Sequence, residues 1–476
     1  MDLDQFRHIL LKECGLKMEK LLVAGISGGP DSLCLLDLLC AARVPVAVAH
    51  FDHGLRPESA LEASMVQQEA KRRGLVFVLG REDVRAAARA AGLSIEEAAR
   101  NARYRFLFSQ ARLLGAGAVA VAHHADDQVE TVLMHLLRGS GLSGLKGMTS
   151  RAVLPDWDAE IPLVRPLLSM WRAEILAYCT EHRLEPVYDE TNSDTKYLRN
   201  RLRHELIPVL ETYNPKFKEG MLRMCSLLAG DYQVLREAVK AGWEDCLVRK
   251  EDGYLILNLE LLRGYSGGLR KNIIREGIAQ LRPALRDIDY DMVMRAETFI
   301  KQPPATRQMK LARQTWLEVE GNRLIIAENL ADVRYPEYPG MDLQSDVLVS
   351  LPSRISLEDG WQLVVEPVEA GVMDHGSLLE GGPDEAWLDA DKLEGTLALR
   401  SRRPGDRFQP LGMGGHSLKL SDFWINERVP RRARERWPLV CSGEKIVWVC
   451  GKRLAEPFRV TGSTRKVIHL RLERVQ

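Results

Sequence analysis

Residues 21–32 read LLVAGISGGPDS, an apolar run that passes directly into two glycines and a polar turn. A short apolar run bounded by turn residues predicts a buried strand, and Asp31 or Ser32 is suited to cap a helix that follows. Gly28 and Gly29 permit a tight turn and a close approach of the backbone to a ligand. Amides at a helix N-terminus bind anions. The stretch therefore predicts a strand, a phosphate-binding turn and a helix; a capped glycine turn that binds no ligand is the alternative.

The alternation of apolar runs and helix-like segments continues as far as residue 138. Strands that alternate with helices predict βαβ units, and hence an α/β fold with a parallel sheet and helices on both faces. Ligands of such sheets bind at the carboxyl ends of the strands. The further apolar runs lie at 45–51, 75–80 and 118–124, between helical patterns at 59–73, 95–114 and 126–138. Polar clusters at the strand ends are expected to converge: SGGPDS (27–32), HFDH (50–53) and HHADD (123–127).

The glycine turn differs from the two most common nucleotide-binding loops. The sequence contains neither GxxxxGK[ST], whose lysine contacts the β- and γ-phosphates, nor the GxGxxG fingerprint of dinucleotide-binding folds. A phosphate bound at this turn would be held by backbone amides and by the hydroxyls of Ser27 and Ser32.

The segment HHADDQVET at 123–131 opens a predicted helix and carries two carboxylates on one face. Asp127 and Glu130 are three residues apart, so they project from the same side of the helix. A carboxylate pair is suited to hold a cationic amine and accept its proton, but the same spacing also fits a capping box. The paired histidines could ligate a metal, although HHxDD lacks the spacing of a known zinc motif. The residues alone leave capping and function open.

Basic residues precede and follow this segment. An arginine that faces the sheet edge can bind phosphate through two parallel hydrogen bonds, and an exposed arginine is the ordinary alternative. The amphipathic helix at 96–107 carries three candidates, Arg100, Arg103 and Arg105. The run YDETNSDTKYLRNRLRHELIP at 188–208 joins an acidic loop to a basic helix. Its candidates for contacts with a nucleic-acid backbone are Lys196, Arg199, Arg201 and Arg203.

The chain has 476 residues, so several domains are expected. Short apolar runs at 254–259 and 323–328 are strand candidates in a region that is otherwise mostly helical. The predicted parts are a catalytic domain at 1–215, a mainly helical middle domain at 216–330, an acidic connector at 331–385 and a small mixed or β-rich domain at 386–476.

The last two parts differ in charge, although the net charge of the whole chain is zero. Residues 327–385 contain 13 Asp and Glu against two Lys and Arg, whereas residues 386–476 contain 19 Lys and Arg against 10 Asp and Glu. A basic terminal domain favours polyanion binding. Charge compensation between two packed parts of one protein is the alternative.

Composition is that of a globular protein, with 45% hydrophobic and 28% charged residues. No apolar run reaches the roughly 18 residues needed to cross a bilayer, and the mixed, acidic N-terminal residues do not resemble a signal peptide. We therefore expect a cytoplasmic protein that does not contact membranes. The eight cysteines include no CxxC pair, which favours reduced thiols over a disulfide framework or a structural zinc site.

Several of these stretches together resemble one enzyme family. SGGPDS resembles the signature loop of the PP-loop ATP pyrophosphatase superfamily, and Pro30 departs from it only at a variable position. The terminal stretch at 400–440 resembles the C-terminal domain of tRNA(Ile)-lysidine synthetases. Other stretches that resemble the same family are FDHGLR (51–56), RNARY (100–104), HHADDQVET (123–131), GSGLSGLKGM (139–148) and the run at 188–208.

The resemblance implies a two-step reaction on the wobble cytidine, position 34, of a tRNA(Ile) with a CAU anticodon. ATP adenylates the C2 carbonyl oxygen and releases pyrophosphate, and the ε-amino group of L-lysine then attacks C2 and displaces AMP, which gives lysidine. The superfamily uses Mg²⁺. Because members of the family often dimerise, a homodimer is a further expectation.

The resemblance also implies roles for residues at matching positions. Arg103 and His123 would lie near the ATP or the adenylate, and Asp127 and Glu130 would bind the lysine amine. Together with Asp31, these four are the expected catalytic residues. ATP binding falls to Ser27, Gly28, Gly29, Pro30, Asp31, Ser32 and His53, with Asp31 as the Mg²⁺ ligand. Contacts with tRNA fall to Lys196, Arg199, Arg201, Arg203, Arg402, Arg403, Arg407 and Lys419.

Three other functions fit parts of the sequence. A tRNA-thiolating enzyme of the same superfamily would adenylate its substrate in the same way, but such enzymes commonly use cysteine pairs. A non-catalytic RNA-binding protein would not need the intact SGGPDS loop or the carboxylate pair. A GMP-synthetase-like enzyme is disfavoured by the basic C-terminus and the absence of a glutaminase half.

Overall fold

The computed structural model describes residues 2–54, 59–187, 198–282, 288–341, 346–369 and 382–475. The chain divides into two compact units, Met1–Arg236 and Glu237–Gln476. Lys196 and the acidic loop of the 188–208 run lie outside the described residues. No helix in the described ranges combines the length and the apolar character that a membrane span requires.

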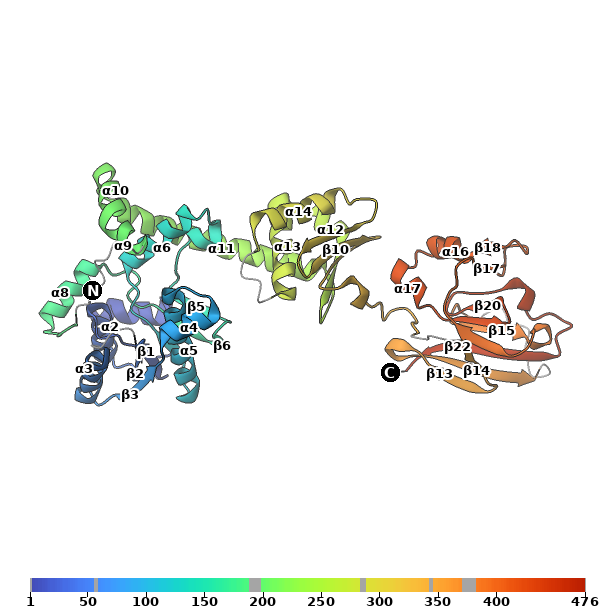
Figure 1. Cartoon of the computed structure of the whole chain (residues 1–476), viewed down its shortest axis with the longest axis horizontal. Helices are drawn as coiled ribbons and strands as arrows, with labels where there is room; N and C mark the ends of the chain where they lie inside the picture. The colour runs from blue at the N-terminus through green and yellow to red at the C-terminus, as the bar shows by residue number, and fades with distance from the viewer. Residues whose placement is uncertain are drawn as a thin grey trace. The chain divides into compact units, whose positions relative to one another are not determined.

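The first unit is built on a six-stranded sheet in the order β3-β2-β1-β4-β6-β5 (Figure 1). All neighbouring pairs are parallel except β5 with β6, which is antiparallel. Both faces of β1 are buried, which explains its continuous apolar sequence. The strands are β1 (Leu22–Gly25), β2 (Val46–Asp52), β3 (Val76–Arg81), β4 (Ala118–Ala120), β5 (Arg151–Leu154) and β6 (Asp158–Val164).

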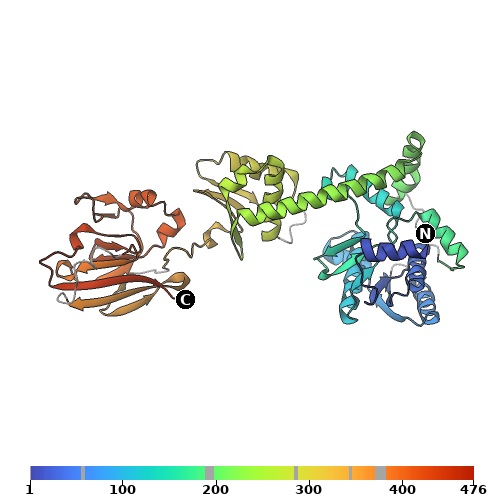
Figure 2. The ribbon, with the colours of Figure 1, turned by 180° about the vertical axis from the view of Figure 1, so that it is seen from behind.

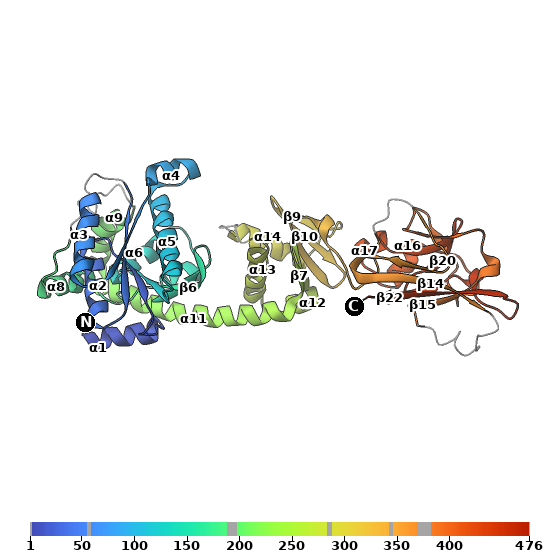
Figure 3. The ribbon, with the colours of Figure 1, turned by 90° about the horizontal axis from the view of Figure 1, so that it is seen from below.

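Helices cover both faces of this sheet, as predicted (Figure 3). On one face, Leu22 and Val46 share a core with α1 (Leu3–His8), α2 (Pro30–Ala41) and α8 (Arg172–Glu181). On the other, Val23 and Ala47 pack against α5 (Ile95–Leu113). The unit also contains α3 (Ser59–Arg72), α4 (Val84–Ala91), α6 (Ala125–Leu137), α7 (Leu142–Leu145), α9 (Leu198–Arg201), α10 (Ile207–Tyr213), the π-helical turns η1 (Ile9–Glu13) and η3 (Leu202–Leu206), and the first part of α11 (Phe217–Cys246).

The middle region is rich in helices, as predicted, and it also contains a five-stranded antiparallel sheet in the order β7-β8-β11-β10-β9. The two apolar runs expected to be strands are β8 and β11, which lie side by side near its centre. The helices are α11 (Phe217–Cys246), α12 (Leu259–Gly264), α13 (Gly267–Leu281) and α14 (Tyr290–Lys301). The strands are β7 (Leu247–Glu251), β8 (Tyr254–Asn258), β9 (Gln308–Ala312), β10 (Thr315–Glu320) and β11 (Arg323–Ala327).

The C-terminal part is β-rich, as predicted, and the long strand β22 stands out in red in Figure 2. β14 pairs with β22 along nine residues, so the stretch expected to be an acidic connector contributes strands to the same sheet as the basic region. Its helices are α16 (Leu420–Asn426) and α17 (Arg431–Glu435). Its strands are β12 (Val347–Leu348), β13 (Ser353–Ser356), β14 (Trp361–Glu369), β15 (Glu385–Asp389), β16 (Leu397–Arg400), β17 (Arg407–Phe408), β18 (Leu418–Lys419), β19 (Leu439–Ser442), β20 (Lys445–Val449), β21 (Arg453–Leu454) and β22 (Lys466–Arg474).

Candidate active site

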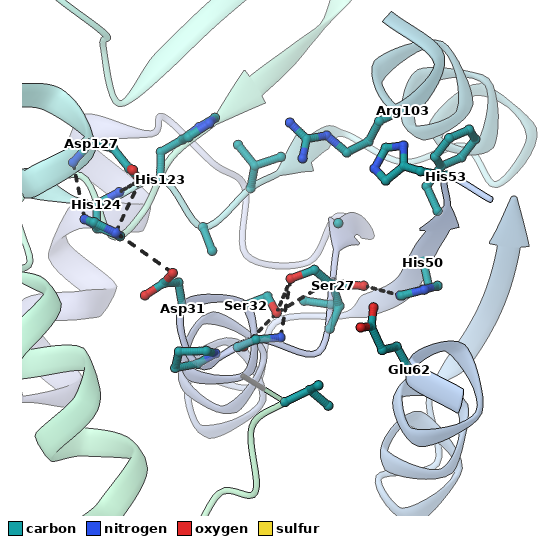
Figure 4. A pocket seen from close by; sticks show the side chains of 18 of the residues that line it. Ser27, Asp31, Ser32, His50, His53, Glu62, Arg103, His123, His124 and Asp127 are labelled. Atoms are coloured by element: carbon teal, nitrogen blue, oxygen red, sulfur yellow. Dashed lines mark hydrogen bonds and ion pairs between the residues drawn. The ribbon is translucent and has the colours of Figure 1, made fainter. Parts of the chain in front are cut away.

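A cavity of about 640 Å³ opens at the carboxyl ends of β1, β2 and β4 (Figure 4). The three polar clusters expected to converge do meet there. The predicted ATP-binding residues line it except Gly28, and so do four of the five predicted catalytic residues. Those four are Asp31, Arg103, His123 and Asp127; Glu130 is not part of the lining.

The glycine turn after β1 is held in shape by its own serine. The Ser32 hydroxyl accepts hydrogen bonds from the amides of Ser27 (3.2 Å) and Gly28 (3.1 Å), and it donates to the carbonyl of Gly29 (2.9 Å). Gly28 has a φ of 93°, which strains any residue with a side chain. At the next strand end, His50 Nδ1 lies 2.9 Å from the carbonyl oxygen of Ile26. The turn is therefore preformed, and it directs the N-terminus of α2 into the cavity.

One wall of the cavity carries polar atoms that are buried without a partner within the described structure. These atoms are His53 Nδ1, Arg103 Nε and His123 Nδ1. Figure 4 shows Arg103 beside His53, with His123 further along the same wall. Burial, together with the charge of Arg103, lowers the pKa of His53 to about 4. Burial is also the main cause that lowers the pKa of His123 to about 3, and the charges of Arg165 and Arg103 contribute. Both imidazoles are neutral near pH 7, so each can donate to or accept from the edge of an uncharged base.

The lowered histidine pKa values predict a loss of stability in mild acid. An unfolded histidine titrates near 6.5, whereas His123 in the folded chain resists protonation until about pH 3. Between these values the unfolded state binds more protons, so stability falls as the pH falls from about 6.5. We expect His123→Gln to show a smaller drop in melting temperature between pH 7.5 and pH 5 than the wild type. His416→Gln, at an exposed loop position, is the control and should match the wild type; an unchanged drop in His123→Gln would contradict the burial argument.

The carboxylates of α6 are already engaged by two arginines. Arg199 Nε donates to Glu130 (2.6 Å) and its NH2 donates to Asp127 (2.7 Å). Arg203 Nε donates to the other oxygen of Glu130 (2.7 Å), and Glu130 is 0% exposed. Burial raises the pKa of the Asp127 carboxyl, but His124 and Arg199 outweigh it and hold that pKa below its usual value. Arg199 and Arg203, expected to contact a nucleic-acid backbone, thus lie on the site's carboxylates.

A capping box is present in α6, but it lies one turn earlier than the sequence suggested. His124 is the N-cap: its Nδ1 accepts from the amide of Asp127 (3.4 Å), while Asp127 accepts from the amide of His124 (3.0 Å). The interpretation of Asp127 and Glu130 as the capping pair was therefore wrong. The true cap was overlooked because histidine is not among the usual cap residues. His124 Nε2 also lies 3.5 Å from Asp127 and 3.9 Å from Asp31, so it sits between the two carboxylates.

Asp31 points away from the serines and toward His124, as Figure 4 shows. Both of its oxygens lie near one nitrogen of Arg172, at 2.9 and 3.1 Å. Sequence reasoning missed Arg172. It considered His124 only as one of two histidines that could ligate a metal, and not as the residue between Asp31 and Asp127.

The cations predicted in the C-terminal part are exposed. Arg407 and Lys419 lie opposite each other on the β17–β18 pair. Arg403 is partly neutralised by Asp346 (2.8 Å) and Glu444 (3.2 Å). In the first unit, Arg201 pairs with the exposed Glu205 at 3.4 Å.

Known proteins match the chain along nearly its full length. A family model described as a PP-loop domain matches residues 3–210, and one described as the TilS substrate C-terminal domain matches residues 397–472. The tRNA(Ile)-lysidine synthase of Geobacter sulfurreducens is 35% identical over 454 residues, which cover 94% of this chain and 92% of that protein. The chain belongs to the tRNA(Ile)-lysidine synthase family.

Other matches include a second tRNA(Ile)-lysidine synthase, from Dehalococcoides mccartyi, which is 34% identical over 94% of each chain. A solved structure reported as "Crystal structure of TILS C-terminal domain" is 26% identical and covers 28% of this chain and 98% of that chain, with a TM-score of 0.25. The cavity described above lies in the part of this chain that matches the PP-loop domain.

Proposed function

We propose that the chain converts the wobble cytidine of tRNA(Ile) with a CAU anticodon to lysidine, with ATP and L-lysine as the other substrates. The observation that carries this proposal is the match of a full-length tRNA(Ile)-lysidine synthase to a chain whose phosphate turn, neutral histidines and carboxylates line one cavity. The C2 oxygen of cytidine attacks the α-phosphorus and pyrophosphate leaves. The lysine ε-amine then attacks C2, the C2–O bond breaks, AMP departs with the oxygen, and the amine loses a proton.

ATP is placed with its phosphates at the glycine turn. The turn and the α2 N-terminus present an electropositive end, which favours a polyanion. His53, Arg103 and His123 offer unpaired nitrogens along the adjoining wall, where the adenine or cytosine edge would lie. The phosphate end and the base end of the cavity are thus chemically distinct.

Asp31 is the residue we assign to Mg²⁺. The ion commonly binds proteins through one or two carboxylates and completes its shell with substrate phosphates and water. A carboxylate that lines the cavity beside the phosphate turn fits that pattern. Within the described ranges no group of three or more His, Cys, Asp or Glu could hold a metal. We propose that a metal at Asp31 takes further ligands from ATP and water. When bound, it would neutralise charge that develops on the phosphates.

Lysine is placed at the opposite carboxylates. Asp127 lines the cavity, so we assign it the contact with the lysine amine. Glu130 is covered by Arg199 and Arg203, so we propose that it acts on lysine by fixing Arg199 beside Asp127. Direct contact of Glu130 with the amine, expected from the sequence, stays a prediction.

The tRNA must deliver its base into the cavity. A wobble base lies in a single-stranded loop, so splaying it out of the stack costs little compared with a base in a duplex. The exposed cations of the C-terminal part are assigned to the tRNA backbone: Arg402, Arg403, Arg407 and Lys419.

Point substitutions test this assignment better than truncation, since removing the chain from residue 386 would strip β14 of its partner β22. Lys419→Ala should raise the tRNA dissociation constant and reduce the log–log salt slope by about 0.7–0.9 if it contacts one phosphate. Lys445→Ala is the control, because Lys445 is exposed but paired with Glu394 at 2.6 Å. Filter binding at three or more salt concentrations measures both quantities. An unchanged slope in Lys419→Ala would remove this residue from the tRNA interface.

We also propose a cytoplasmic location and a homodimer.

The cysteines bear on the alternative of sulfur transfer. All eight are free, and burial raises the pKa of their thiols, as for Cys14 (to about 12) and Cys246 (to about 11). Protonated, buried thiols are poor nucleophiles, which weighs against sulfur transfer by these residues.

The decisive experiment is incubation of the full chain with ATP, Mg²⁺, labelled lysine and tRNA(Ile) with a CAU anticodon. We expect label in the RNA, together with AMP and pyrophosphate in equal amounts. Omission of ATP, and replacement of the tRNA by an elongator tRNA(Met) with the same anticodon, are the controls. AMP formation without lysine in the RNA would count against lysidine synthesis and leave only the adenylation step.

A further inference from the structure

Arg172 is a cation in the cavity wall to which the proposed reaction assigns no role. It is the first residue of α8 and lines the cavity together with the glycine turn. Its NH1 donates to both oxygens of Asp31, at 2.9 and 3.1 Å. The guanidinium therefore lies within one hydrogen bond of the N-terminus of α2, where the phosphates of ATP are placed.

The contact with Asp31 leaves the paired-donor edge of Arg172 unused. Arginine binds carboxylates and phosphates most strongly through two parallel N–H groups. Here a single nitrogen, NH1, bonds both oxygens of Asp31, and within the described part of the chain Nε and NH2 form no hydrogen bond. That edge can therefore accept an oxyanion.

The backbone of Arg172 is fixed by its neighbours. Its amide donates to Asp126 Oδ2 (2.9 Å), and Asp126 Oδ1 in turn accepts from Lys218 Nζ (3.2 Å). The Lys218 ammonium also lies 5.2 Å from the ring centroid of Trp171, the N-cap of α8. Arg172 is therefore presented to the cavity from a rigid helix start, with only its side chain free to move.

From this geometry we infer that Arg172 is a phosphate-binding residue that holds the β- and γ-phosphates of ATP and the pyrophosphate they become. Asp31 positions it in the ligand-free enzyme. When polyphosphate binds, the unused edge takes two of its oxygens, and the pair with Asp31 loosens as that carboxylate turns to its own ligand. The inference rests on the proposed function, because it takes the glycine turn as the ATP site.

The test measures product binding rather than turnover. Binding of inorganic pyrophosphate and of AMP to the full chain is determined by calorimetry for wild type, Arg172→Gln and Arg172→Lys. Loss of a charge-assisted pair of bonds predicts a pyrophosphate dissociation constant raised about 10- to 100-fold in Arg172→Gln, with AMP binding within twofold of wild type. Arg172→Lys should recover part of the loss, because lysine offers charge without the fork. Arg183→Gln, exposed just beyond α8, should bind both ligands normally.

A second arm separates direct contact from an effect through Asp31. In an Asp31→Asn background, Arg172→Gln should still weaken pyrophosphate binding by at least about tenfold if the guanidinium touches phosphate. No further loss in that background would mean that Arg172 acts only by neutralising Asp31, and it would overturn the inference. Equal losses for pyrophosphate and AMP would also overturn it, since they indicate a disturbed fold. Lysine incorporation by the wild type is scored in parallel, so that failure of the proposed function is recognised separately.

Discussion

Glu130→Ala is expected to lower the stability of the first unit by about 3 kcal/mol, the lower end for a broken buried ion pair, because the two arginines that lose this carboxylate are only partly buried. Glu130 is 0% exposed and bonds Arg199 and Arg203 at 2.6 and 2.7 Å. For a unit of this size the melting temperature should fall by roughly 10 °C. The measurement is thermal unfolding of the full chain. ATP identifies the relevant transition, since a ligand stabilises the unit that binds it.

Glu205→Ala provides the matched control. Glu205 also pairs with an arginine, Arg201, at 3.4 Å, but its side chain is 53% exposed. An exposed pair of this kind contributes less than about 1 kcal/mol, so the melting temperature should barely change. Equal effects in the two variants would refute the assignment of Glu130 as the buried anchor. If Glu130→Gln folds well but requires more lysine, the residue also contributes to lysine use.

The part of the site predicted from sequence is the part that follows from strand order. Asp31, His53 and Asp127 each follow a strand of one parallel sheet, and the carboxyl ends of such strands share an edge. Their convergence needs no knowledge of side-chain packing. Arg172 is different, because it lies 141 residues from Asp31 and begins a helix. The periodicity of a sequence does not predict which helix N-terminus will lie at a cavity.

The same limit explains the arginines of the 188–208 run. A basic helix after an acidic loop indicates a polyanion partner only if its cations stay free. Arg199 lies 72 residues from Asp127 and 69 from Glu130, yet it bonds both. Carboxylates that look like a ligand site in sequence were thus already paired, and only the fold shows the partners.

In the middle region only the strands with continuous apolar runs were predicted. The buried strand β10 was missed because glutamates interrupt its sequence, TWLEVE. β8 and β11 are buried along nearly their whole length and read as apolar runs. The edge strands β7 and β9 are half exposed and carry charges, as in LVRKE and QMKLA. An edge strand that must resist pairing with other chains loses the apolar signal by which a strand is recognised.

Asp31→Asn is expected to reduce pyrophosphate release by about 10²–10³-fold while the protein remains folded, because it removes the carboxylate assigned to the metal at the phosphates. Folding should suffer little, since Asp31 is partly exposed and asparagine can still accept a bond from Arg172. Asp37→Asn, in the same helix, is the counterpart. Asp37 lies outside the cavity lining and binds Arg73 and the Tyr178 hydroxyl at 2.8 Å each.

The two variants should therefore show opposite losses. Asp37→Asn is expected to lose about 1–3 kcal/mol of stability, because Arg73 and Tyr178 keep only a neutral partner, yet each folded molecule should release pyrophosphate at nearly the wild-type rate. Asp31→Asn should melt near the wild-type temperature and release almost none. Pyrophosphate release in the presence of tRNA, normalised to the folded fraction from thermal melts, gives both quantities. If Asp31→Asn retained near-normal release, neither the metal nor the phosphates could depend on this carboxylate, and the glycine turn would have to bind ATP without it.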